Sequence, residues 1–247
     1  MSAYIMPGFP YRDSTPGALK AAEEAGTDFV ELGIPFSDPL ADGPVIQRAA
    51  HTAIENGMTP RIVLQIVAEF RKTSQMPLIL MGYVNSFLNG IGKNFAASLR
   101  DAGADGVIIP DLSLEESGWA RKQIEDAGLS LVLLIAPTSD DGRIGEIDRA
   151  TTDFSYCVSV TGVTGARRNL VSGDVTSFLG RVRRLATKPF VVGFGISTPE
   201  AAREISRYSD GIVVGSALLQ EMSAAPKGEE AGRAKTFLTS LRAAIDK

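Results

Sequence analysis

Short apolar runs alternate along this chain with longer amphipathic stretches. The runs are four or five residues long, rich in Val and Ile, and mostly apolar at every position. They are Ala3–Met6, Asp28–Leu32, Leu78–Met81, Gly106–Ile109, Leu131–Ile135, Tyr156–Ser159, Phe190–Gly193 and Gly211–Val214. Strands that are covered by helices have this continuous apolar pattern instead of a strict alternation. The pattern predicts eight buried parallel strands.

Segments with helical periodicity lie between these runs. They cover residues 18–25, 60–73, 95–102, 115–127, 143–150, 177–185, 199–208 and 231–245. Thr198-Pro199 reads as a cap followed by Pro at the first helical position. Three helices are predicted to end at Ala-Gly pairs, where Gly26, Gly103 and Gly128 suit the left-handed position after a helix. The recurring join is a weak internal repeat of strand–helix units.

Eight such units within 247 residues predict a (β/α)8 barrel. A doubly wound open sheet is the alternative, but it would not need eight similar units. No linker, low-complexity segment or charge block marks a second domain. The sequence therefore predicts one barrel domain over residues 1–247.

Composition and charge narrow the possible functions. The formal net charge of −4 gives no indication of nucleic-acid or membrane-surface binding, and no apolar stretch approaches the length of a membrane span. The N-terminus lacks the features of a signal peptide, so we expect a cytoplasmic location. A single Cys157 excludes an intramolecular disulfide, and a single His51 excludes a His-rich metal site. We expect neither a metal nor another cofactor.

The segment from Glu31 to Pro44 carries the most informative chemistry. Glu31 ends an apolar run, and a loop with Pro and Gly then carries Asp38 and Asp42. Active sites of barrels lie at the carboxyl ends of the strands, and burial there raises the pKa of an acid. The alternatives are an ion pair between Glu31 and a distant Lys or Arg, and turn formation by the two aspartates.

Glycine-rich turns follow the last three predicted strands. They contain Gly165, Gly195 and the pair Gly215-Ser216. Glycines let backbone N–H groups approach an anion, and a helix that starts at Ser216 would add its dipole. These turns predict a phosphate site, although each glycine alone could simply form a tight turn.

The motifs as a set resemble the tryptophan synthase alpha subunit family. The resemblance starts with Glu31 followed by Leu-Gly-Ile-Pro-Phe-Ser-Asp-Pro-Leu-Ala-Asp-Gly-Pro44. It continues through Met81–Asn85, Gly106–Leu112, Val158–Arg167, Gly193–Ser197 and Asp210–Ser216. It covers nearly the whole chain in order. It implies cleavage of indole-3-glycerol phosphate to indole and glyceraldehyde 3-phosphate in tryptophan biosynthesis.

The resemblance also implies roles for individual residues. Glu31 matches the acid–base carboxylate, Asp42 the acid at the indole N–H, and Tyr156 a tyrosine near the reacting groups. The implied substrate-binding residues are Tyr4, Tyr83, Thr164, Gly165, Phe194, Gly195, Gly215 and Ser216. Asp38, Asn85 and Ser113 are expected to face a tryptophan synthase beta subunit in an alpha2beta2 complex.

Three features depart from the family pattern. The first strand begins almost at Met1, so the extra helix that usually precedes it is expected to be missing or lost to a late gene start. Ser113 stands where Pro is usual, and Met6-Pro7 replaces a smaller pair. Ser113 and the short N-terminus motivate one alternative, a stand-alone lyase that releases indole. Two further alternatives are a non-catalytic barrel that binds the phosphate ligand and activates a partner, and a phosphosugar isomerase on a similar barrel.

Overall fold

A computed structural model describes residues 1–158, 173–193 and 195–246 of the chain. Its strands are β1 Ser2–Ile5, β2 Phe29–Gly33, β3 Leu78–Met81, β4 Gly106–Ile108, β5 Ser130–Val132, β6 Leu134–Ile135, β7 Ser155–Val158, β8 Phe190–Gly193 and β9 Gly211–Val214. All pairs are parallel, in the order β5-β4-β3-β2-β1-β9-β8-β7-β6. Because β5 and β6 are two pieces of one run, interrupted at Leu133, the sheet closes on itself. The predicted (β/α)8 barrel is confirmed.

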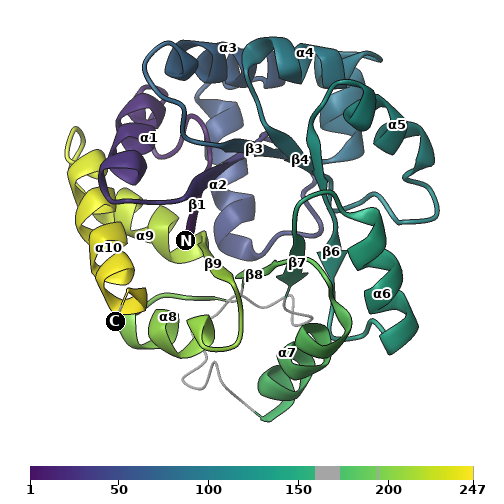
Figure 1. Cartoon of the computed structure of the whole chain (residues 1–247). Coiled ribbons are helices and arrows are strands. Elements are labelled where there is room, and N and C mark those ends of the chain that lie inside the picture. The colour runs from purple at the N-terminus through teal and green to yellow at the C-terminus, as the bar shows by residue number, and fades with distance from the viewer. Residues whose placement is uncertain (159–172, 194, 247) are drawn as a thin grey trace.

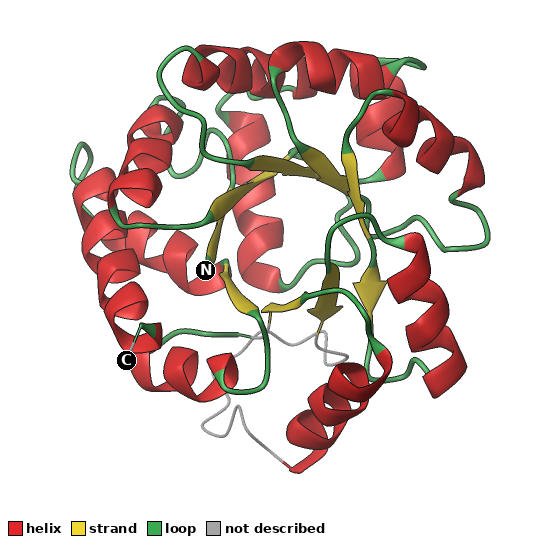
Figure 2. Cartoon of the chain, in the orientation of Figure 1, coloured by secondary structure: helices red, strands yellow, loops and turns green. Residues whose placement is uncertain are grey.

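Helices surround this ring of strands (Figures 1 and 2). They are α1 Ser14–Glu24, α2 Pro44–Glu55, α3 Pro60–Arg71, α4 Phe95–Ala102, α5 Gly118–Asp126, α6 Asp141–Ala150, α7 Gly173–Leu185, α8 Pro199–Ser206, α9 Ser216–Ala224 and α10 Glu230–Ile245, with a π-helix, η1 Ser86–Ile91. Each predicted helical segment corresponds to one of them within a few residues, whereas α2 and η1 were not among the predicted segments. None of the helices in the described ranges is both long and apolar enough to cross a membrane.

The predicted helix ends agree with the structure. The Thr198 Oγ1 atom accepts a hydrogen bond from the Ala201 N–H at 3.2 Å, and Pro199 is the first residue of α8. Gly26, Gly103 and Gly128 have φ angles of 76°, 94° and 68°. These caps end each helix sharply, and the next strand can then begin within a few residues.

Strand residues alternate between two apolar regions. One set packs outward against the helices, and the other fills the barrel interior, where Ile79, Ile108, Val132, Tyr156, Val191 and Val213 form a separate cluster. Because side chains alternate along a strand, the position of Tyr156 in this inner cluster places Cys157 and Ser155 on the outer side of β7. The same alternation decides which polar side chains enter the barrel.

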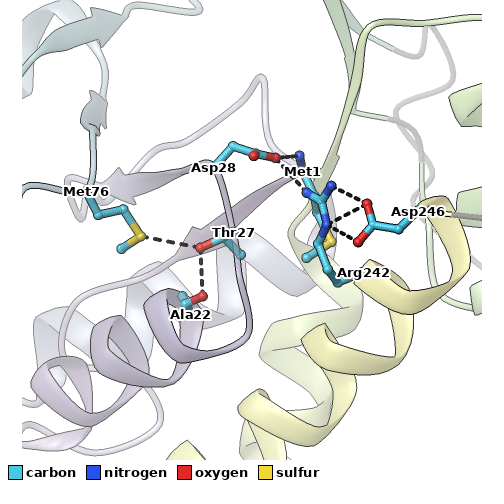
Figure 3. A network of polar contacts seen from close by, with 7 residues as sticks. All are labelled: Met1, Ala22, Thr27, Asp28, Met76, Arg242 and Asp246. Atoms are coloured by element: carbon cyan, nitrogen blue, oxygen red, sulfur yellow. Dashed lines mark hydrogen bonds and ion pairs between the residues drawn. The ribbon is translucent and has the colours of Figure 1, made fainter.

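A polar network lies where β1 and β2 begin (Figure 3). The Met1 amine and Arg242 of α10 both pair with Asp28, Arg242 at 2.8 Å, and Arg242 also pairs with Asp246. Beside it, the Thr27 hydroxyl donates to the Ala22 carbonyl oxygen at 2.8 Å. The network fastens the last helix to the amino-terminal end of the barrel. It leaves the carboxyl end of the strands open for a site.

Candidate active site

Glu31 lies inside the barrel without a polar partner. It is opposite Tyr4 on β1 and Ile79 on β3, its exposure is 0 %, and neither carboxyl oxygen has a hydrogen-bond partner among the described residues. Burial raises its pKa from 4.5 to about 8, against a smaller lowering effect of the nearby Ser2 hydroxyl. No described Lys or Arg forms an ion pair with it, so the alternative of a distant cation has no support. The carboxyl is mainly neutral at pH 7.

Asp42 is held in a different way at the mouth of the barrel. The Tyr83 hydroxyl donates to Asp42 Oδ2 at 2.9 Å and accepts from the Ala41 N–H at 3.0 Å. Burial raises the Asp42 pKa to about 6, and the Tyr83 hydrogen bond works in the opposite direction. The Tyr83 ring stacks on Phe36 with a centroid distance of 5.2 Å. Asp42 is therefore mainly ionised at pH 7, and the hydrogen bond from Tyr83 to Oδ2 orients its carboxylate.

Two buried phenols complete the cluster around the acids. A Cβ atom on Gly33 would overlap the Tyr4 hydroxyl, and one on Gly193 would overlap that of Tyr156. The two glycines therefore make room for the tyrosines in the barrel. Burial raises the pKa of both phenols, and the charges of Glu31 and Asp42 raise it further. The structure thus brings Tyr4, Glu31, Asp42, Tyr83 and Tyr156 together.

The sequence-predicted phosphate residues lie partly within the described ranges. Gly215 lies against the Tyr4 side chain, since a Cβ on it would be 3.4 Å from Tyr4 Cβ, and Ser216 begins α9 as expected. The free N–H groups of a helix N-terminus favour an anion there. Gly195 follows β8 and is exposed. Thr164, Gly165 and Phe194 lie outside the described residues.

The three predicted partner-facing residues lie apart from this cluster, on the surface. Asp38, Asn85 and Ser113 are all exposed, and each hydrogen-bonds only a near neighbour in the sequence among the described residues. Leu40, which is 88 % exposed in the same loop as Asp38, was not among the predicted residues. Neither was Ser2, which lies beside Glu31. The sequence offers no distinct signal for Ser2, because β5 and β7 also begin with a serine.

The arrangement supports proton transfer. It offers a buried neutral acid, a nearby carboxylate, three phenols and a helix N-terminus at the carboxyl end of a barrel. In the described part of the chain, no three His, Cys, Asp or Glu side chains are grouped so that they could hold a metal ion. Fold and site together define a (β/α)8-barrel enzyme of the acid–base type.

Comparison with known proteins identifies the family. A sequence model described as Tryptophan synthase alpha chain matches residues 1–245. A tryptophan synthase alpha chain of Roseiflexus sp. (strain RS-1) is 48 % identical over 240 residues, which are 97 % of this chain and 92 % of the relative. One from Dehalococcoides mccartyi is 43 % identical over 244 residues, 99 % of this chain and 94 % of the relative.

Solved structures agree with the sequence match. The alpha subunit of tryptophan synthase from Legionella pneumophila superposes with a TM-score of 0.90 at 36 % identity, covering 99 % of this chain and 92 % of that chain. A chain of the tryptophan synthase complex from Pyrococcus furiosus gives 0.89 at 33 % identity, with 98 % and 97 % covered. This chain belongs to the tryptophan synthase alpha chain family. It is a lyase of tryptophan biosynthesis.

Proposed function

We propose that this chain cleaves indole-3-glycerol phosphate to indole and glyceraldehyde 3-phosphate. One observation carries the proposal: Glu31 is fully buried, has no cation beside it in the described part of the chain, and has a pKa of about 8. A carboxyl group in this state is neutral at pH 7 and can donate its proton, which an ordinary surface carboxylate cannot do.

In the proposed reaction, Glu31 protonates C3 of the indole ring. The ring nitrogen becomes positively charged, and the Asp42 carboxylate stabilises that charge through the N–H group. The Glu31 carboxylate then removes the proton of the adjacent glycerol hydroxyl. The bond between C3 and the glycerol carbon breaks, its electrons return to the ring, and an aldehyde forms. Glu31 ends neutral again, so protons and electrons balance over one turnover.

The other residues bind the substrate in this proposal. Tyr4 and Tyr83 contact the indole, and Tyr156 lies near the reacting groups. Gly195, Gly215 and Ser216 hold the phosphate through backbone N–H groups and a hydroxyl. On the resemblance alone, Gly165 joins this phosphate site, Phe194 joins the indole pocket, and Thr164 belongs to a loop that closes over the substrate.

We further propose that the partner is a tryptophan synthase beta subunit. The support is that Asp38, Asn85 and Ser113 are each exposed, and that Leu40, a large apolar side chain in the same loop as Asp38, is 88 % exposed. Isolated exposed leucines are common, but Leu40 lies only two residues from Asp42. A partner that covers Leu40 could therefore influence Asp42 directly. The cytoplasmic location stays a prediction.

A steady-state assay tests the function and the partner together. Purified chain is mixed with indole-3-glycerol phosphate, and indole is measured with and without a tryptophan synthase beta subunit. Slow formation of indole that the beta subunit strongly accelerates supports both proposals. High activity that the beta subunit does not change would indicate a stand-alone lyase. An absence of indole under both conditions would refute the proposed reaction.

A further inference from the structure

Ser2 and Glu31 are two buried polar side chains that lie near each other in the otherwise largely apolar barrel interior. Ser2 is opposite Phe29 and Val213, and both belong to or pack against the inner cluster, so its side chain enters the barrel. It lies one position before Ala3 and two before Tyr4, which is opposite Glu31. The Ser2 hydroxyl is therefore diagonal to the Glu31 carboxyl across neighbouring strands.

Both groups lack a partner among the described residues. Ser2 and Glu31 are each 0 % exposed, and the Ser2 hydroxyl and both Glu31 oxygens make no hydrogen bond there. A buried polar atom without a partner costs about 1–3 kcal/mol, and more when it is charged. The inward residue opposite Glu31 on β3 is Ile79, which offers no polar atom. Ser2 places its hydroxyl near the Glu31 carboxyl from the amino-terminal side of the barrel.

We propose that Ser2 is a positioning residue for Glu31, whose hydroxyl donates to the carboxylate and accepts from the neutral acid. A hydroxyl suits this task because it can do both, whereas a lysine or an amide N–H can only donate. Glu31 changes protonation state twice in each turnover of the proposed reaction, so its support must fit both states. The inference deepens, and rests on, the proposed function.

The surroundings of Glu31 define what a change at Ser2 can alter. The titratable groups that face it from described elements are Tyr4 of β1, Tyr156 of β7 and Asp42, with Tyr83 behind Asp42. None of them carries a positive charge. The Ser2 hydroxyl is thus the group that favours the ionised form of Glu31, and it lowers the Glu31 pKa. Its removal should raise that pKa.

Ser155 provides a matched control. It is also a serine at 0 % exposure on a barrel strand, and its hydroxyl also lacks a partner in the described part of the chain. However, it faces the helices, because the neighbouring Tyr156 faces the interior. Ser155→Ala removes the same atom at the same depth without changing the surroundings of Glu31. The two variants separate an effect on Glu31 from an effect on packing.

The test is a titration of the Glu31 carboxyl in the full-length chain by infrared difference spectroscopy. The band of the neutral acid is assigned by its loss in Glu31→Gln. We expect Ser2→Ala to shift the midpoint upward, with a roughly three- to tenfold change in the acid dissociation constant. We expect Ser155→Ala to leave the midpoint unchanged and Ser2→Thr to restore it.

Kinetics provide the second measurement. Ser2→Ala should lower kcat for indole formation by roughly three- to tenfold with KM within about twofold, since Ser2 is fully buried and is not among the proposed substrate-binding residues. A wild-type midpoint in Ser2→Ala would overturn the proposal while the lyase activity stands. If the wild-type chain forms no indole, the proposed function fails, and the infrared titration still decides the role of Ser2. If Ser2→Ala does not fold, the near-isosteric Ser2→Cys takes its place in the same titration.

Discussion

Asp28 and Glu31 are three positions apart in the sequence, one just before β2 and the other at its centre, and their environments are opposite. Asp28 just precedes β2 and pairs with the Met1 amine and Arg242. Burial opposes its ionisation, but these two cations outweigh that effect and lower its pKa. Glu31 lies within β2, pairs with no described cation, and has a pKa of about 8.

The comparison shows that two acids close together in the sequence can serve different purposes, one stabilising the fold and the other donating a proton. An acid with two cationic partners is ionised at every ordinary pH and fastens α10 to the barrel. An acid without partners destabilises the fold in its ionised form, and for that reason it keeps a proton that it can donate. Removal of the Asp28 carboxylate should therefore leave the lyase activity nearly unchanged, and removal of the Glu31 carboxyl should abolish it.

The sharpest test is to neutralise each acid in turn. Glu31→Gln keeps the shape but removes the proton donor, so we expect indole formation to fall by at least about 10³-fold. Asp28→Asn should leave kcat within about twofold, because Asp28 lies before β2 and pairs with the Met1 amine and Arg242, not with the site residues. Steady-state assays of both purified variants, with circular dichroism to verify folding, measure this contrast. Substantial indole formation by Glu31→Gln would remove Glu31 from the mechanism.

The same variant should show the cost of Glu31 to the fold. Its pKa in the folded state is about 8 against 4.5 ordinarily, so the folded chain binds more protons than the unfolded chain between these values. Stability of the wild type must then fall as the pH rises from about 4.5 to 8. Gln does not titrate. The difference in free energy of unfolding between Glu31→Gln and the wild type should therefore grow in favour of the variant across this window, by on the order of 3 kcal/mol.

Urea unfolding at several pH values from 5 to 8 measures that difference. Glu31→Gln and the wild type should be closest in stability at pH 5 and furthest apart at pH 8. A constant difference over the whole range would mean that Glu31 is already ionised in the folded chain, which contradicts its assignment as a neutral acid.

A second comparison sets Asp42, which is expected to act as a carboxylate, against Glu31, which is expected to act as a neutral acid. It is expected to act in its ionised form, so Asp42→Asn should lower kcat/KM by roughly 10²-fold. In the wild type, kcat/KM should rise as the pH passes about 6, where Asp42 ionises, and fall as it passes about 8, where Glu31 loses its proton. Asp42→Asn should lose the lower of these two transitions. Its persistence in the pH profile would assign that transition to another group.

Much of the fold could be read from the sequence because its signals are local. Apolar runs such as Leu78–Met81 and Phe190–Gly193 coincide with β3 and β8, and the Ala-Gly joins mark helix ends. The interruption at Leu133 was not predicted, because the run from Leu131 to Ile135 is apolar throughout. His51 was expected in a helix, which is α2, but the bounds of α2 were not predicted although Pro44 stands at its start, as Pro60 and Pro199 do in α3 and α8.

The site could be read only in part because its contacts are long-range. Glu31 and Asp42 follow from their place at a strand end, but their ranking came from the family resemblance. The hydrogen bond between Tyr83 and Asp42 spans 41 positions, and the sequence offers no spacing that indicates it. Ser2 faces Glu31 because of the register between β1 and β2. Such contacts depend on how the barrel closes, which no short segment encodes.

The smallest expected effect is at Asp28 itself. Its side chain is 60 % exposed, so solvent screens its ion pairs, and Asp28→Asn should lower the free energy of unfolding by only about 1 kcal/mol. Because the Asp28 pKa is lowered in the folded state, this contribution is present at pH 7 and is lost as the pH falls below its ordinary value of 3.8. Urea unfolding at pH 7 and pH 3 should therefore show a larger deficit at pH 7 than at pH 3, and added salt should reduce it. The control is Arg242→Gln alone and combined with Asp28→Asn: a double variant less destabilised than the sum of the single variants shows that the two residues act as a pair. Additive losses would mean that Asp28 relies on the Met1 amine instead.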